Sequence, residues 1–305
     1  MKILSSLKRK RRQLNEIHAN VQNIKFFMRR LQLEDKILHS TEPGVSSERY
    51  CDHDIVLSLT TYGRRLEDVC FTIESLMQQT KKANRIILWL DPPCSAQPLP
   101  DTLVRLQARG LEVKITEEYI RSYKKLIPAL EACPDDAIIT VDDDALYDFD
   151  IVERLVNAYL AEPQAIHACR IHTMLPDGKG KLKSYNRWKL CFCDPNTPSR
   201  NFFTGVGGVL YPPRSLDAEV LNREVFTSIC PTADDVWFNA MAIKKGTPIR
   251  KVVTRNTAGN DYLSNDEVQD MALCNINTGR QCQNNPQIEA VFTKYGIYRL
   301  IGITD

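Results

Sequence analysis

Apolar residues in the first 35 positions recur at alternating steps of three and four, which predicts one long helix. No glycine or proline interrupts the pattern. A stripe this narrow is typical of a coiled-coil seam, with Lys10 as its polar interruption. The seam residues are Leu7, Leu14, Ile17, Val21, Ile24, Met28 and Leu31. We expect this face to contact a second copy of the chain, an anionic membrane surface or the chain's own domain.

Residues 1–39 are thus expected to form a basic amphipathic helix, and residues 40–50, rich in Ser, Pro and Gly, a linker. Strand and helix patterns then alternate. Strands are predicted at 54–60, 85–90, 111–116 and 137–141, and helices at 66–79, 101–108 and 122–132. This alternation predicts an α/β fold, with a Rossmann-like, mostly parallel central sheet flanked by helices and preceded by a helical extension.

The second half of the chain is less regular. Helices are predicted at 151–160 and 233–243, and strands at 168–172, 188–192 and 249–253. A glycine-bearing stretch at 201–213 lies between them. His172, two residues after Arg170 on a predicted strand, can line a crevice, although a structural role is the simpler interpretation.

The apolar run at 137–141 ends in three consecutive carboxylates, Asp142, Asp143 and Asp144. Ligands bind at the carboxyl ends of strands in open α/β sheets. The two-residue period of a strand puts Asp142 and Asp144 on one face and Asp143 on the other. Two carboxylates on one face suit Mg²⁺ or Mn²⁺, with waters and substrate phosphates completing the shell.

The ends of the first two predicted strands, and the predicted helix after the third strand, also carry residues that suit a nucleotide diphosphate. An aromatic ring can stack on a base, a carboxylate can accept from a base N–H, and lysines can neutralise a pyrophosphate. The donor-binding candidates are Thr60, Tyr62, Arg64, Asp91, Lys124, Lys125, Asp142 and Asp143. Turn packing for Tyr62 and a solvated helix face for the two lysines are the structural alternatives.

Composition is that of an ordinary globular protein, with 43% hydrophobic and 26% charged residues. No apolar run approaches the roughly 20 residues of a membrane span, and the N-terminus lacks the pattern of a secretory signal. Ten scattered cysteines without a CxxC pair indicate reduced thiols in the cytoplasm. Residues 1–30 hold nine of the 40 basic residues and one of the 38 acidic ones. The rest is therefore acidic on balance, which argues against nucleic-acid binding.

The order of features from residue 54 to 246 resembles a GT-A glycosyltransferase, close to the inverting family-two enzymes. Asp142-Asp143-Asp144 resembles the DxD motif of that fold. Some ninety residues later, Gly205-Val206-Gly207-Gly208-Val209-Leu210-Tyr211 and then Asp234-Asp235-Val236-Trp237 resemble its glycine-rich stretch and acidic pair. Where many family-two enzymes have Asp-Asp-Gly-Ser after the second strand, this chain has Asp91-Pro92-Pro93.

The resemblance implies a role for each of these motifs. Asp142 and Asp144 would hold Mn²⁺ or Mg²⁺, and Asp235 would be the general base, with its carboxylate form favoured by the helix dipole. The implied acceptor-binding residues are Gly207, Gly208, Asp234 and Trp237. A helix cap for the acidic pair, a tight turn for the glycines and a core position for the tryptophan are the structural alternatives.

The resulting expectation is a glycosyltransferase domain at 51–255 and an acceptor-side lid at 256–305, in which Asn265-Asp266 has no assigned role. The enzyme would move a hexose from a nucleotide-diphosphate sugar to a glycan or lipid-linked acceptor, with inversion, in bacterial surface polysaccharide synthesis. We expect it in the cytoplasm, with peripheral contact to the inner face of the membrane through residues 1–35. A nucleotidyltransferase acting on sugar phosphates and a non-catalytic sugar-binding module are the alternatives.

Overall fold

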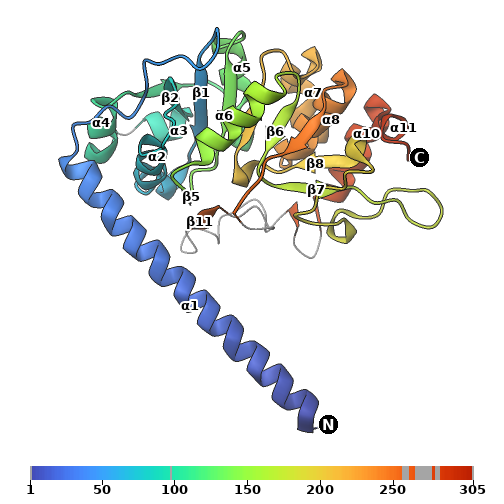
Figure 1. Cartoon of the computed structure of the whole chain (residues 1–305). Helices are drawn as coiled ribbons and strands as arrows, with labels where there is room; N and C mark the ends of the chain where they lie inside the picture. The colour runs from blue at the N-terminus through green and yellow to red at the C-terminus, as the bar shows by residue number, and fades with distance from the viewer. Residues whose placement is uncertain (1, 97, 256–260, 265–276, 279–281, 304–305) are drawn as a thin grey trace.

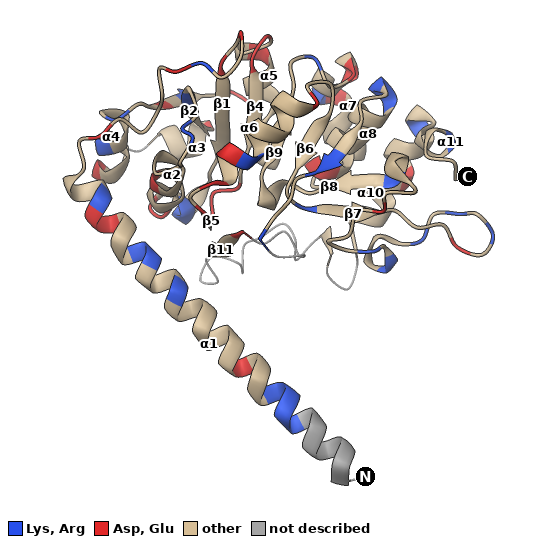
Figure 2. Cartoon of the chain, in the orientation of Figure 1, with Lys and Arg blue, Asp and Glu red and all other residues tan. Residues whose placement is uncertain are grey.

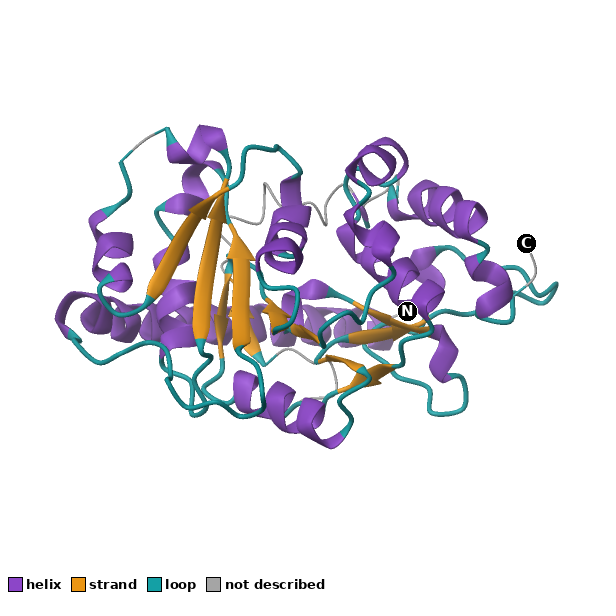
Figure 3. Cartoon of the chain, turned by 90° about the horizontal axis from the view of Figure 1, so that it is seen from above, coloured by secondary structure: helices purple, strands orange, loops and turns teal. Residues whose placement is uncertain are grey.

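A mostly parallel sheet with helices on both sides forms the centre of the protein (Figures 1 and 3). The computed structural model describes residues 2–96, 98–255, 261–264, 277–278 and 282–303. Within these residues the sheet has seven strands. They are β1 (Ile55–Thr60), β2 (Arg85–Leu90), β3 (Leu111–Ile115), β4 (Ala137–Thr140), β6 (Ile166–Ala168), β9 (Val209–Tyr211) and β10 (Ile249–Lys251). The predicted fold class is confirmed.

The strand order β10-β6-β9-β4-β1-β2-β3 brings the predicted strand ends together. β1 pairs with β2 and β4, and β2 pairs with β3, all in parallel. The carboxyl ends of β1 and β4 are therefore neighbours, as predicted. β9 was not predicted in this place: it runs antiparallel between β4 and β6.

Alternation along β1 divides the core into two layers, because successive side chains of a strand point to opposite faces. Ile55, Leu57 and Leu59 pack on one face, and Val56 packs on the other. The first face is covered by α2 (Val69–Met77), α4 (Asp101–Gln107) and α6 (Ile151–Ala161). The second is covered by η2 (Arg121–Lys125), α5 (Ile127–Ala132), α7 (Arg223–Ile229), α8 (Asp234–Lys245), α10 (Asn284–Tyr295) and α11 (Ile297–Leu300).

Two strand predictions in the second half are wrong. The run at 168–172 is split between β6 and β7 (Ile171–Thr173), and β7 pairs with β8 (Asn201–Phe203) outside the main sheet. The run at 188–192 is no strand, because Cys191 adopts a φ of 55°, which strand geometry excludes.

The nine described cysteines are all free thiols. A second small sheet joins β5 (Ala145–Tyr147) to β11 (Tyr262–Ser264).

The remaining elements are short. The predicted helix at 122–132 is two pieces, the 3₁₀ helix η2 and α5. The other short elements are η1 (Gly63–Leu66), α3 (Pro92–Ser95), η3 (Tyr185–Arg187), η4 (Pro198–Arg200), η5 (Gly205–Gly207) and η6 (Ala218–Leu221).

The described part of the predicted lid at 256–305 contributes to the core. Ile288, Val291 and Phe292 of α10 are buried in the same cluster as the apolar residues of α8. The division of the chain at residue 255 stays a prediction. Asn265 and Asp266 lie outside the described residues.

The predicted N-terminal helix is α1 (Lys2–His39), whose N-terminal end projects from the body (Figure 1). Its C-terminal third packs on the domain through Phe26, Leu33 and Ile37, which are buried. Arg30 forms an ion pair with Asp68 at 2.9 Å. Phe26 and Leu33 also pack on Leu146 of β5. The helix is thus anchored next to the strand that follows the three aspartates.

The face that packs on the domain is not the coiled-coil seam. Phe26 is two residues from both Ile24 and Met28, and two residues turn a helix by roughly 200°, to its opposite side. The seam is exposed: Leu14, Met28 and Leu31 show 66%, 60% and 66% of their surface to solvent. Arg9 to Arg12 add a cluster of positive charge near the projecting end (Figure 2). Among the described residues, every helix is too short or too polar to cross a membrane.

Self-association and membrane contact through this exposed seam both stay predictions. Deleting residues 1–22 removes Leu14, Ile17 and Val21 but leaves the anchoring Phe26, Leu33 and Ile37 in place. If the seam pairs two copies, light scattering is expected to give a dimer for the full chain and a monomer for the deletion variant. If the full chain is itself a monomer, the coiled-coil prediction is wrong. Co-sedimentation with anionic vesicles then tests the membrane alternative.

Candidate active site

The carboxyl ends of β1 and β4 open into a pocket of about 650 Å³. Nine of the predicted site residues line it: Thr60, Tyr62, Lys124, Lys125, Asp142, Asp143, Asp144, Asp234 and Asp235. They come from β1 and the segment after it, η2, the turn after β4 and the start of α8. The structure therefore brings the DxD-like turn and the later acidic pair into one cavity, although some ninety residues separate them in sequence.

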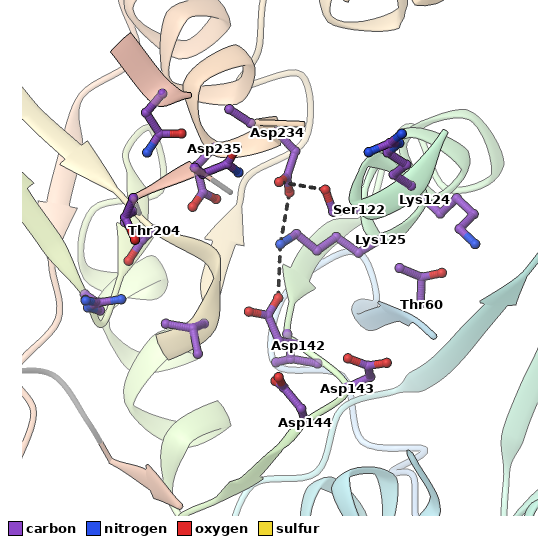
Figure 4. Close-up of a pocket in the computed structure, with 18 of the residues that line it drawn as sticks. Thr60, Ser122, Lys124, Lys125, Asp142, Asp143, Asp144, Thr204, Asp234 and Asp235 are labelled. Carbon is purple, nitrogen blue, oxygen red and sulfur yellow. Dashed lines mark hydrogen bonds and ion pairs between the residues drawn. The ribbon is translucent and has the colours of Figure 1, made fainter. Parts of the chain in front are cut away.

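A chain of ion pairs crosses the middle of the pocket (Figure 4). The Nζ of Lys125 lies 3.0 Å from Oδ1 of Asp142 and 3.0 Å from Oδ2 of Asp234. Ser122 donates to Oδ1 of Asp234 at 2.8 Å. One ammonium thus links the turn after β4 to the N-terminus of α8.

Local structure explains why Lys125 reaches this position. The hydroxyl of Ser58 on β1 donates to the backbone oxygen of Lys125 at 2.6 Å, which fixes η2 on the end of the sheet. Lys124 and Lys125 are both buried, so the alternative of a solvated helix face is excluded. Burial alone lowers the pKa of Lys125. The carboxylates of Asp142 and Asp234 outweigh it and hold that pKa well above the usual lysine value.

Asp143 turns away from the ion-pair chain, toward the side of Thr60 (Figure 4). Its carboxylate accepts from the hydroxyl of Thr61 at 2.6 Å and from Arg65 at 2.8 Å. Arg65 also lies 3.2 Å from Asp144. The arginine at the site is thus the buried Arg65, whereas the predicted Arg64 is exposed and does not line the pocket.

The oxygens of Asp142 and Asp144 fit a hard divalent cation. Figure 4 shows the two side chains next to each other. Among the described residues, no third His, Cys, Asp or Glu lies close enough to complete a three-residue group with them. Mg²⁺ and Mn²⁺ accept such a site, because they keep several waters and take further oxygens from substrate phosphates.

Asp235 is the carboxylate best suited to accept a proton at neutral pH. Its Oδ1 accepts from the backbone N–H of Gly205 at 3.1 Å. Burial and then the charge of Asp234 raise the pKa of Asp235 to about 7, although Lys125 opposes them. The helix dipole favours the carboxylate, as expected from the sequence, but burial and the like charge of Asp234 outweigh it, so the net shift of the pKa is upward.

None of the three glycines of this stretch lines the pocket, but Gly205 contacts Asp235 through its backbone N–H, whereas Gly207 and Gly208, which were predicted to bind the acceptor, have no such contact among the described residues. A Cβ at Gly205 would lie 2.6 Å from Nζ of Lys125 and 3.4 Å from Oδ1 of Asp235. A Cβ at Gly207 would meet Arg170, and Gly208 has a φ of 91°. Gly207 and Gly208 thus lie in a tight turn, and their predicted role in acceptor binding stays a prediction.

Gly205→Ala is expected to lower turnover roughly tenfold to a hundredfold, because its methyl group displaces the ammonium of Lys125 and tilts Asp235. Steady-state kinetics with a nucleotide-sugar donor measure this. Gly178→Ala is the matched control, since no atom lies within 4 Å of a Cβ at that position. Equal turnover of the two variants would show that close approach at Gly205 is unimportant.

Two further predicted residues lie outside the pocket. Asp91 is 1% exposed, caps α3 and forms an ion pair with Lys124, so it supports that lysine and does not face a base. Trp237 is fully buried, and its indole N–H donates to the backbone oxygen of Val220 at 3.0 Å. In this structure both side chains therefore have structural contacts, and neither faces the pocket.

The pocket also contains residues that sequence reasoning did not select. They are polar or aromatic side chains: Thr61, Arg65, Tyr119, Arg121, Ser122, Arg170, Tyr185, Asn186, Thr204, Tyr262, Ser264, Asn277, Thr278 and Asn284. His172, which was predicted to be able to line a crevice, is also in the pocket wall. The proximity of Arg170 and His172 on a predicted strand was the one available signal. The others depend on long-range pairing, such as β5 with β11.

The sequence matches no protein-family model and no curated protein. Among solved structures, the chain is similar to the mannosyltransferase PcManGT from Pyrobaculum calidifontis in complex with GDP-Man and Mn²⁺. That similarity has 14% identity, covers 76% of this chain and 65% of the other, and has a TM-score of 0.40.

Two other solved structures are similar to a comparable degree. HddC from Yersinia pseudotuberculosis gives 13% identity, 53% and 78% coverage of the two chains, and a TM-score of 0.34. CMP:2-keto-3-deoxy-manno-octonic acid synthetase complexed with CTP gives 14%, 66% and 89%, and 0.38. All three TM-scores lie below 0.5, so the function must be argued from the pocket itself.

Proposed function

We propose that this protein is a metal-dependent, GT-A-type glycosyltransferase that moves a hexose from a nucleotide-diphosphate sugar to a glycan or lipid-linked acceptor with inversion. The observation that carries the proposal is that one pocket holds a DxD-like turn and a separate acidic pair, Asp234 and Asp235, with Lys125 between them. Bacterial surface polysaccharide synthesis is the setting we propose for it.

Inversion in one step requires a base on the acceptor side of the sugar. The acceptor hydroxyl attacks the anomeric carbon, its proton passes to Asp235, and the bond from that carbon to the phosphate oxygen breaks. The nucleoside diphosphate leaves with the bonding electron pair. A base with a pKa near 7 is largely ionised just above neutral pH and still holds the proton it receives.

On the donor side, Asp142 and Asp144 would hold Mn²⁺ or Mg²⁺. The cation, when bound, neutralises charge that develops on the leaving diphosphate. Arg65 orients the turn by pairing with Asp143 and Asp144. Tyr62, which is half-buried in the pocket wall, can stack on the base. Lys125 connects the donor side to the acidic pair through its ion pairs with Asp142 and Asp234.

Thermal shift with nucleotide diphosphates and nucleotide sugars, each with Mn²⁺, Mg²⁺ or EDTA, tests the donor site. A ligand that binds the native state raises Tm by mass action. We expect a shift that needs both one nucleotide and a metal, and its loss in Asp144→Ala. A shift of the same size in that variant or in EDTA would contradict the assigned metal site.

A further inference from the structure

Arg170 is a partly buried cation of the pocket wall that no carboxylate of the described residues neutralises. It lies between β6 and β7, and its Nε donates to Sγ of Cys191 at 3.4 Å. The other buried cations of the wall each pair with an aspartate: Lys124 with Asp91, Lys125 with Asp142 and Asp234, and Arg65 with Asp143 and Asp144.

The backbone around Arg170 is held in place on two sides. The N–H of Thr204 donates to its backbone oxygen at 3.1 Å. Gly207 packs so closely that a Cβ there would lie 3.1 Å from the Cβ of Arg170. The backbone and Cβ of Arg170 are therefore fixed, and the contact of Nε with Sγ of Cys191 is what orients the guanidinium.

His172 supplies a second donor to the same wall. Its Nδ1 accepts from the backbone N–H of Cys191 at 2.9 Å, so the ring proton of the neutral form is on Nε2. Burial, and then the charge of Arg170, lower the pKa of His172 to about 4. The ring is therefore neutral at pH 7.

Cys191 has a strained backbone and contacts the side chains of both Arg170 and His172. Its sulfur accepts from Arg170 and its N–H donates to His172, while its φ of 55° is rare for a residue with a side chain. Strained backbone of this kind is concentrated at functional sites. The segment that failed to form the predicted strand at 188–192 is thus the one that positions Arg170 and His172.

Both residues lie on the acceptor side of the pocket. β7 pairs with β8 so that Ile171 faces Phe203, which makes Arg170 the neighbour of Thr204. In Figure 4, Thr204 and Asp235 lie on one side of the Asp142–Lys125 ion pair, and Thr60 lies on the other. Arg170 therefore shares its side with the proposed base.

We propose that Arg170 and His172 form a binding site for an oxyanion of the acceptor, so that the acceptor is a sugar or glycan bearing a carboxylate or a phosphate. The inference rests on the proposed function. Nη1 and Nη2 of Arg170 form a planar pair of donors that matches two oxygens of such a group. Nε2–H of His172 adds a neutral donor. The bound anion neutralises a guanidinium that the pocket leaves without a counter-charge.

Calorimetric titration of the full chain with matched sugars tests this site without any nucleotide. The probes are methyl β-glucuronide against methyl β-glucoside, and glucose 6-phosphate against glucose, which differ only at the anionic group. We expect one anionic member to bind roughly tenfold to hundredfold more tightly than its neutral partner. The pair that shows the preference distinguishes a carboxylate from a phosphate. Equal affinities within both pairs overturn the proposal.

Variants then assign the preference to the residue. Arg170→Gln is expected to abolish it, Arg170→Lys to keep part of it, and Arg187→Gln, an exposed control outside the pocket, to keep all of it. A preference that survives in Arg170→Gln overturns the proposal.

A nucleotide titration separates this proposal from the proposed function. Binding of nucleoside diphosphates with Mn²⁺, followed by thermal shift, is expected to be unchanged in Arg170→Gln. If it is lost, Arg170 contacts the donor diphosphate and the acceptor site is wrong. If the wild-type chain binds no nucleotide but keeps the preference for an anionic sugar, the proposed function fails and the oxyanion site stands.

Discussion

Asp235→Asn is expected to lower kcat of glycosyl transfer roughly 10²- to 10⁴-fold, the usual contribution of a general base. The amide fits the same space and still accepts from Gly205 N–H, but it cannot accept the acceptor's proton. The KM for the donor is expected to change little, because the nucleotide-binding residues are unaffected. Asp135→Asn, on the exposed surface, is the matched control.

The pH profile distinguishes a lost base from a disturbed fold. Asp235 must be ionised to act, and its pKa is about 7. In the wild-type chain, kcat/KM is therefore expected to fall tenfold per pH unit below about pH 7 and to be level above it. The residual activity of Asp235→Asn is expected to lack this limb. Wild-type rates in the variant would exclude Asp235 as the base.

Lys125→Met is expected to have the largest effect on stability. The ammonium is the cation between Asp142 and Asp234, and its side chain is 8% exposed. Removing it leaves the carboxylates uncompensated, and breaking a buried pair in this way costs about 3–5 kcal/mol. For a chain of this size, Tm is expected to fall by roughly 5–15 °C. Differential scanning calorimetry measures the change.

Two further variants test that explanation. Lys179→Met removes an exposed lysine and is expected to leave Tm unchanged. Lys125→Met combined with Asp234→Asn removes the cation together with one anion and is expected to recover part of the lost stability. If the double variant melts below the single one, charge imbalance is not the cause.

The sheet could be predicted from the sequence because its signals are local. Each of β1 to β4 ends within about a residue of its predicted boundary, and the rule that ligands bind at strand ends places Asp142 near Thr60. The insertion of β9 between β4 and β6 could not be predicted, because short strands carry no signal of direction or partner.

The details of the site depend on which of several neighbouring residues faces the pocket, and the local sequence does not determine this. Arg64 and Arg65 are adjacent in sequence, and only the turn of η1 decides that Arg65 is buried on Asp143. Gly207 and Gly208 were predicted to be site residues and Gly205 was not, although of the three only Gly205 lies against Lys125 and Asp235. Each choice depends on contacts between distant segments of the chain.

Product analysis tests the central claim most directly. The chain is incubated with a panel of nucleotide-diphosphate sugars, Mn²⁺ and either an acceptor sugar or water alone, and phosphorus NMR identifies the nucleotide released. Glycosyl transfer predicts a nucleoside diphosphate, which EDTA and Asp235→Asn suppress. A parallel incubation contains a sugar phosphate, a nucleoside triphosphate and Mn²⁺. Formation of nucleotide sugar and pyrophosphate there, with no nucleoside diphosphate released in the first incubation, would contradict the account and support nucleotidyl transfer instead.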